Sequence, residues 1–242
     1  MLKQPLWMIP MGYYLGLAGI ALGLWLVASG AASPWWLVAW AGFHILGSLM
    51  LSVGLHRYFA HGAFQASQFW HRFMAFYSVL LLNGSPQGWA AAHNTHHVHS
   101  DTQRDPHFAD WHYLYNKRYR DVPLVRWRLR ALAGDPALAF VHRYGLPLWL
   151  AACAGMLLAS PTFFLFAYLM PLGSTHLIGA IHQISSHRGG KPRDLPWLEF
   201  ILPACGEWLH ETHHDHPGRA DFRTRWWHLD LGAAFICLIR KP

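Results

Sequence analysis

Residues 4–56 read QPLWMIPMGYYLGLAGIALGLWLVASGAASPWWLVAWAGFHILGSLMLSVGLH and contain no Asp, Glu, Lys or Arg. The small residues and proline of Ser29–Pro34 divide this stretch into two halves, each long enough to cross about 30 Å of hydrocarbon as a helix. A second charge-free stretch lies between Arg143 and Arg188 and divides at Ser160-Pro161. The pattern predicts two helical hairpins with four membrane spans, at about residues 8–29, 35–56, 140–159 and 162–183.

The composition of the chain agrees with this pattern. Of its 242 residues, 53% are hydrophobic and only 13% are charged, whereas soluble domains carry about 25% charged residues. This composition excludes a disordered chain, a coiled coil and an ordinary soluble enzyme. We therefore expect an all-α integral membrane protein in which residues 1–242 form a single domain.

The positive charges predict the orientation of the spans. All 19 Lys and Arg residues lie at position 3, between 57 and 143, or between 188 and 241. Positively charged loops stay in the cytoplasm, so we expect a cytoplasmic helical cap built from residues 57–139 and 184–242. Within this cap, residues 65–90 are expected to form an amphipathic helix that lies at the membrane surface or dips into it. The membrane is expected to be the inner membrane of a bacterium. The net charge of +7 then indicates contact with anionic lipid and not with nucleic acid.

The chain contains 19 histidines, and eight of them form three clusters near the predicted membrane surface. In a helix, residues at i, i+3 and i+4 share one face, so the second and third clusters can each aim three imidazoles at one point. The members of the first cluster, at i and i+5, are about 140° apart on an ideal α-helix. Either the helix ends there, or the two side chains reach around a metal from different sides. The clusters are His56 and His61; His93, His96 and His97; and His210, His213 and His214.

Eight neutral imidazoles exceed the four ligands that one zinc ion takes. Two iron-type ions, each with five or six ligands, would use all of them. Ligating histidines usually donate their other ring N–H to a carboxylate or a carbonyl, and Asp101, Asp105 and Glu207 are candidates for that role. The three cysteines are far apart in the sequence and form no C-x-x-C pair, which argues against a thiolate site.

These motifs resemble the membrane fatty acyl desaturases, and within them the acyl-CoA desaturase-like group. The resemblance covers nearly the whole chain from about residue 35, and its motifs occur in the family's order and spacing. The matching segments are GLHRYFAH at 54–61, Trp89 with HNTHH at 93–97, SDT at 100–102 with DPH at 105–107, GEWLHETHH at 206–214, and RWWH at 225–228.

The resemblance implies a di-iron centre that activates O₂ and removes hydrogens from a long acyl chain, forming a cis double bond. It also implies one more ligand in a segment reading Asn-Ser-x-x-His, with glycine shortly after. The best match is Gln183–His187, in which His187 is the ligand and Gln183 replaces an asparagine that reaches a metal through water. His182 and His176 compete with His187 for this role.

The sequence also limits the partners. It has no G-x-G-x-x-G dinucleotide motif, no cysteine cluster and no room for a haem domain. The electrons are therefore expected from a separate donor, such as a ferredoxin or a small haem protein. Glu211 and Asp215-His216-Pro217 depart from the acyl-CoA group's usual residues. Hence the acyl carrier stays open between acyl-CoA, acyl carrier protein and an acyl lipid.

Two other functions compete with desaturation. A membrane di-iron lipid hydroxylase uses similar histidine clusters and the same oxidant, but returns oxygen to the substrate. The segment His210-Glu211-Thr212-His213-His214 also satisfies the H-E-x-x-H signature of zinc proteases, with Glu211 as general base. The protease hypothesis leaves the first two histidine clusters without a role.

Overall fold

The computed structural model of the chain describes residues 8–107 and 122–241. The segment 108–121, which the sequence assigns to the cap, lies outside the described residues. In the described part every regular element is a helix, and the only β-pairings are two isolated bridges, Ala66 with Arg240 and Asp194 with Leu209. The prediction of an all-α fold is confirmed, whereas the single domain stays a prediction.

Four described helices are long and apolar enough to cross a membrane, as predicted. The first is α1 (Met8–Ala28), and the third is α6 (Pro136–Ala159). The second runs from Trp36 to His61 and consists of α2 (Trp36–Leu49) followed by the π-helix η1 (Met50–His61). The fourth runs from Pro161 to Ser186 and consists of α7 (Pro161–Phe163), the π-helix η3 (Phe164–Leu169) and α8 (Met170–Ser186).

The hairpin turns fall where small residues and prolines predict them, but three helix ends differ from the predicted spans. The second helix continues to His61, where Gly62 adopts a left-handed conformation with a φ of 63°. The fourth helix continues to Ser186, and the third begins earlier, because the Asp135 carboxylate accepts hydrogen bonds from the N–H groups of Ala137 and Leu138. Caps set the end at His61 and the start at Pro136, whereas hydropathy marks only the apolar part of each helix.

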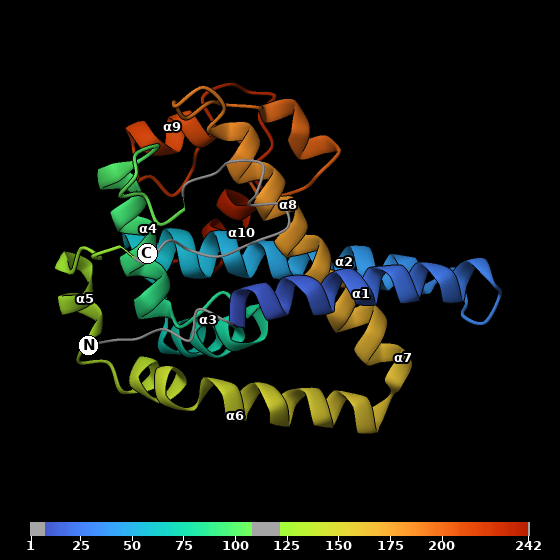
Figure 1. Ribbon diagram of the computed structural model, residues 1–242. Coiled ribbons are helices and arrows are strands. Elements are labelled where there is room, and N and C mark those ends of the chain that lie inside the picture. Colours follow the sequence, from blue (N-terminus) through green and yellow to red (C-terminus); the bar gives the residue numbers. More distant parts are fainter. Residues whose placement is uncertain (1–7, 108–121, 242) are drawn as a thin grey trace.

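The α8 helix crosses α1 and α2 at close range (Figure 1). At the crossing Gly16 of α1 faces Gly173 of α8, and a Cβ atom on either glycine would collide with the backbone of the other. Small residues at such a crossing let two helix backbones approach closely, which is how helices associate in lipid.

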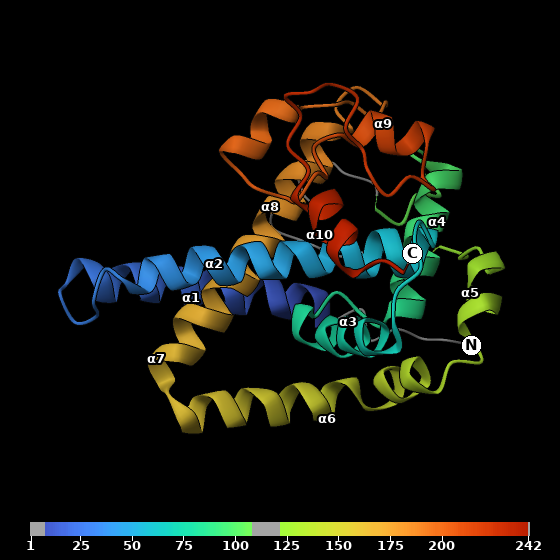
Figure 2. The ribbon, with the colours of Figure 1, turned by 180° about the vertical axis from the view of Figure 1, so that it is seen from behind.

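The remaining helices surround the ends of the second and fourth spans. Among them, α4 packs against η1, α10 packs against η1 and α2, and α3 packs against α6 (Figures 1 and 2). The predicted amphipathic segment at 65–90 contains α3, which exposes Phe69 and Phe76. The helices are α3 (Gln68–Leu81), α4 (Pro86–His99), α5 (Trp127–Leu132), the 3₁₀-helix η4 (Pro196–Phe200), α9 (His210–Asp215) and α10 (Leu231–Ile239).

Candidate metal centre

The π-helix η1 explains how His56 and His61 work together. In a π-helix the backbone bonds from residue i to residue i+5, so residues five apart lie one above the other. The ring centroids of His56 and His61 are accordingly 5.0 Å apart. The helix ends at His61, as one of the two alternatives expected, and the π-helical winding before that end brings both rings to one side.

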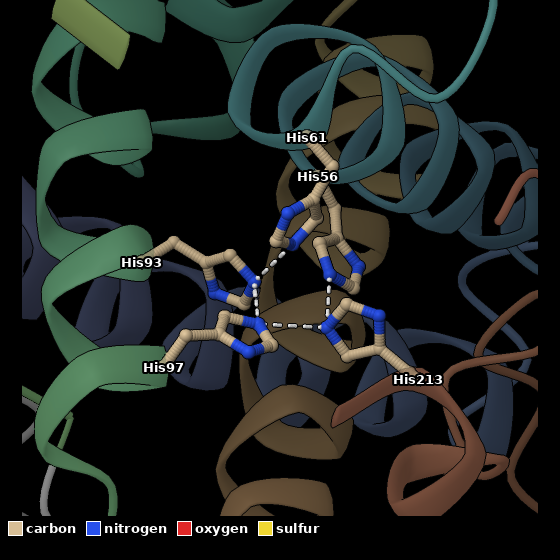
Figure 3. Close-up of side chains that lie close together, drawn as sticks. All are labelled: His56, His61, His93, His97 and His213. Carbon is tan, nitrogen blue, oxygen red and sulfur yellow. Dashed lines mark hydrogen bonds between the residues drawn. The ribbon is translucent and has the colours of Figure 1, made fainter. Parts of the chain in front are cut away.

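Five histidines converge on one point, which we call site 1. Their ligand nitrogens all lie within 4.8 Å of one another. Nε2 of His93 lies 2.9 Å from Nε2 of His61 and 3.0 Å from Nε2 of His97, and the chain of close nitrogens continues to the other members (Figure 3). The members are His56 and His61 from η1, His93 and His97 from α4, and His213 from α9.

Four further histidines form site 2, within the same 4.8 Å limit. Nε2 of His210 lies 2.7 Å from Nε2 of His187 and 3.1 Å from Nε2 of His214. The rings of His97 in site 1 and His214 in site 2 stack with centroids 4.3 Å apart, so the two sites are neighbours. The members are His96, His187, His210 and His214.

The second and third histidine clusters divide between the two sites, contrary to the expectation that each aims at one point. In α4, His93 and His97 join site 1 whereas His96 joins site 2; in α9, His210 and His214 join site 2 whereas His213 joins site 1. In a helix, i and i+4 diverge by about 40°, while i+3 lies about 60° to the other side of i. The pair at i and i+4 thus serves one site, and the residue at i+3 serves the other.

Each of the three predicted carboxylates accepts a hydrogen bond from Nδ1 of a histidine in these sites. Asp105 accepts from His96 at 2.9 Å, and Asp101 accepts from His187 at 3.1 Å. Glu207 accepts from His56 at 2.6 Å and also from the Ser52 hydroxyl at 2.5 Å. A neutral imidazole that donates from Nδ1 keeps a lone pair on Nε2. These three rings therefore present lone pairs to the two sites.

The electrostatics of the sites favour neutral imidazoles. Burial, reinforced by the neighbouring imidazoles, holds the pKa values of His93, His96, His210 and His213 well below their usual range. The same causes lower the pKa of His97 to about 2. Although burial alone would raise it, the pKa of Glu207 is lowered to about 2, because His56 and Arg57 lie beside it. Neutral nitrogen donors backed by carboxylates form a donor set that fits two metal cations.

The competing histidines lie outside both sites. Nε2 of His182 bonds the carbonyl of Glu207 at 2.8 Å, and Nε2 of His176 bonds the carbonyl of Leu81 at 2.7 Å. The geometry therefore favours His187 as the additional ligand. Gln183 is buried, and its amide nitrogen has no hydrogen-bond partner in the described structure.

A pocket opens beside the histidines. Its cavity volume is about 100 Å³, and its wall includes Gln183 together with His56, His93 and His210. A second pocket of about 20 Å³ shares Thr175 with it and is lined by Tyr77 and Tyr168, between α2, α3, η3 and α8. The first pocket therefore reaches histidines of both sites.

Sequence reasoning missed the buried Arg57. Its guanidinium is fully buried, pairs with Asp230 at 2.9 Å and lies 3.8 Å from the nearer oxygen of Glu207. It also stacks over the Phe222 ring at 3.8 Å. The available signal was that a charged residue directly follows the candidate ligand His56 at the end of an apolar span. Charged side chains are seldom buried unless they are paired, so Arg57 could be expected to have a partner.

Comparison with known proteins gives several relatives that are named fatty acid desaturases. The chain is 26% identical over 207 residues to an sn-1 stearoyl-lipid 9-desaturase of Anabaena variabilis, covering 78% of this chain and 74% of the relative. It is 29% identical to the Delta(9)-fatty-acid desaturase fat-5 of Caenorhabditis elegans, covering 79% and 65%. It is 27% identical to an acyl-CoA Delta(11) desaturase of Trichoplusia ni, covering 89% and 66%. No family model matches the chain.

Proposed function

Since the chain belongs to the fatty acid desaturase family, we propose that it uses two iron ions and O₂ to introduce a cis double bond into a long acyl chain. An oxidoreductase acting on fatty acids follows from the relatives. The di-iron centre, the residues that hold it and the reaction are the proposal.

The convergence of nine histidines on two neighbouring sites carries this proposal. Site 1 would hold one iron and site 2 the other, with Asp101, Asp105 and Glu207 orienting three of the ligand rings. Gln183 faces the pocket with an unpaired amide nitrogen, and its side chain can bind a water beside the metals. Two irons bound there would supply the oxidising power that O₂ activation provides and that acid–base side chains lack against a methylene group.

The protein's own residues then have to hold a flexible chain in place. The pocket meets site 1 at His56 and His93 and site 2 at His210, so an acyl chain lying in it would present neighbouring carbons to both sites. Fixing the chain in this way removes most of the entropic barrier to reaction.

The substrate's carrier and the electron donor would meet the cap. We propose a long acyl group on coenzyme A, acyl carrier protein or a lipid, and a separate donor such as a ferredoxin or small haem protein. An acidic donor suits a basic surface, because opposite charge speeds association. We further propose that the cap faces the cytoplasm of a bacterial cell.

The test is expression in a host that makes only saturated acyl chains, together with an active electron donor, followed by mass spectrometry of the lipids. We expect a product lighter by two hydrogens. The matched variants are His93→Ala, which removes a site 1 ligand and should abolish the product, and His216→Ala. His216 lies exposed just beyond α9 in neither site, so its removal should leave the product unchanged.

Other outcomes would overturn the proposal. A product heavier by one oxygen would identify a hydroxylase, and an unchanged lipid profile with a loaded iron site would require a different substrate class. The protease hypothesis is disfavoured by position: Glu211 is exposed to solvent, whereas His210 and His214 share site 2 with His96 and His187.

A further inference from the structure

Residues 195–206, LPWLEFILPACG, form a segment of unusual composition in the cap. Its only charged residue is Glu199, whose side chain is buried with 2% exposure. Three large apolar side chains point outward instead: Trp197 is 56% exposed, Phe200 64% and Ile201 66%. Trp197 and Phe200 are three residues apart in the 3₁₀-helix η4, so they lie on the same face.

This segment contacts the second membrane-spanning helix far from its cap end. The His44 ring in α2 bonds the Pro203 carbonyl at 3.0 Å. His44 lies about 12 Å along the helix from Trp36, by the rise of 1.5 Å per residue, and the helix continues beyond it to His61. With a hydrocarbon layer about 30 Å thick, the Pro203 carbonyl lies at the depth of the membrane interior.

The backbone of this segment is satisfied from within the protein. The Glu199 carboxylate accepts hydrogen bonds from the N–H groups of Ala204, Cys205 and Gly206, at 2.9, 2.6 and 3.1 Å. The N–H groups of Ile201 and Leu202 bond the carbonyl of Leu198, and Pro203 has none. Every N–H from residue 201 to residue 206 therefore has a partner.

Three carbonyl groups of the irregular turn, those of Leu202, Pro203 and Cys205, also have partners within the protein. The Trp208 indole donates to Leu202 at 2.7 Å, and the Ser52 hydroxyl donates to Cys205 at 3.1 Å. Irregular backbone survives at membrane depth only when protein groups satisfy it, since lipid offers no hydrogen bonds.

We infer that residues 196–202 lie within the hydrocarbon region of the membrane, with Trp197, Phe200 and Ile201 in contact with lipid. The occupant of this apolar surface is then the membrane and not a second protein. The segment continues the lipid-facing surface of the spans, and it ends next to Glu207, which holds His56. This inference concerns membrane contact and does not depend on the proposed reaction.

The test uses a nitroxide spin label at Phe200→Cys in the full-length protein, reconstituted into phosphatidylcholine vesicles. Cys153 and Cys237 are replaced by alanine and serine, while the fully buried Cys205 is kept. The measurement compares collisions of the label with oxygen, which concentrates in lipid, and with a water-soluble nickel chelate. Matched labels at Leu22→Cys, 48% exposed on α1, and at the exposed Arg219→Cys mark lipid and water.

We expect the label at position 200 to match the Leu22 site, with high oxygen and low nickel accessibility. A label at Trp197→Cys gives a second reading in case the first variant does not fold, and gel filtration checks each variant. If the labels at both positions resemble the Arg219 site, the segment lies in water and the inference is overturned.

Discussion

At the scale of single residues, the protein uses both ring nitrogens of its candidate ligands. In His56, His96 and His187, Nδ1 donates to a carboxylate while Nε2 points into a site. The carboxylate fixes both the tautomer and the orientation of the ring. Losing a carboxylate should therefore weaken metal binding even though the imidazole remains.

Asp105→Asn tests this directly. Asp105 is 1% exposed and accepts from His96 as well as from the N–H groups of Asp101 and His107. Replacing one carboxylate oxygen by an amide nitrogen places a donor where these N–H groups need an acceptor. We expect iron affinity to fall about 10- to 100-fold, measured by competition with a chelator.

The matched control is Asp221→Asn. Asp221 is half-buried, pairs with Arg223 and belongs to neither site, so its substitution should leave the affinity unchanged. Equal affinities for the Asp105 variant and the unmodified protein would show that this carboxylate does not support the centre.

At the scale of elements, helix geometry decides which histidines meet. Nine histidines and three carboxylates could be named from spacing and resemblance, because charge-free spans and repeated histidines are visible in the sequence. The π-helix at 50–61 was not visible, since no residue pattern marks the shift from i+4 to i+5 bonding. The histidines of α4 divide between the two sites because of where η1 and α9 lie beside that helix. This placement belongs to the tertiary structure and leaves no pattern in the sequence.

The crossing of α1 and α8 gives a prediction at this scale. Gly16→Ala would push a methyl group into the backbone of Gly173. We expect a loss of about 1–3 kcal/mol in the free energy of unfolding, the usual effect of overpacking, measured by thermal or denaturant unfolding in detergent.

Gly42→Ala is the matched control, because a Cβ atom there meets nothing within 4 Å. Alanine is the better helix former by about 1 kcal/mol, so this variant should be as stable as the parent or more so. Equal effects at both positions would argue against the close crossing.

At the scale of the whole molecule, the positive charges predict that both hairpin turns face away from the cap. Reporter fusions after Ala32 and Pro161 should report an extracytoplasmic location, and a fusion after residue 241 a cytoplasmic one. The reason is the absence of Lys and Arg from the turns. A cytoplasmic signal at either turn would contradict this topology.

The central claim is that nine histidines from two cap helices and the ends of two spans hold two metal ions. The most direct measurement is the metal content of the protein purified under mild, anaerobic conditions. We predict about two irons per chain, with both lost from a variant in which His93, His96 and His97 are all alanine. One zinc per chain, retained in that variant, would contradict the claim and return the H-E-x-x-H protease to first place.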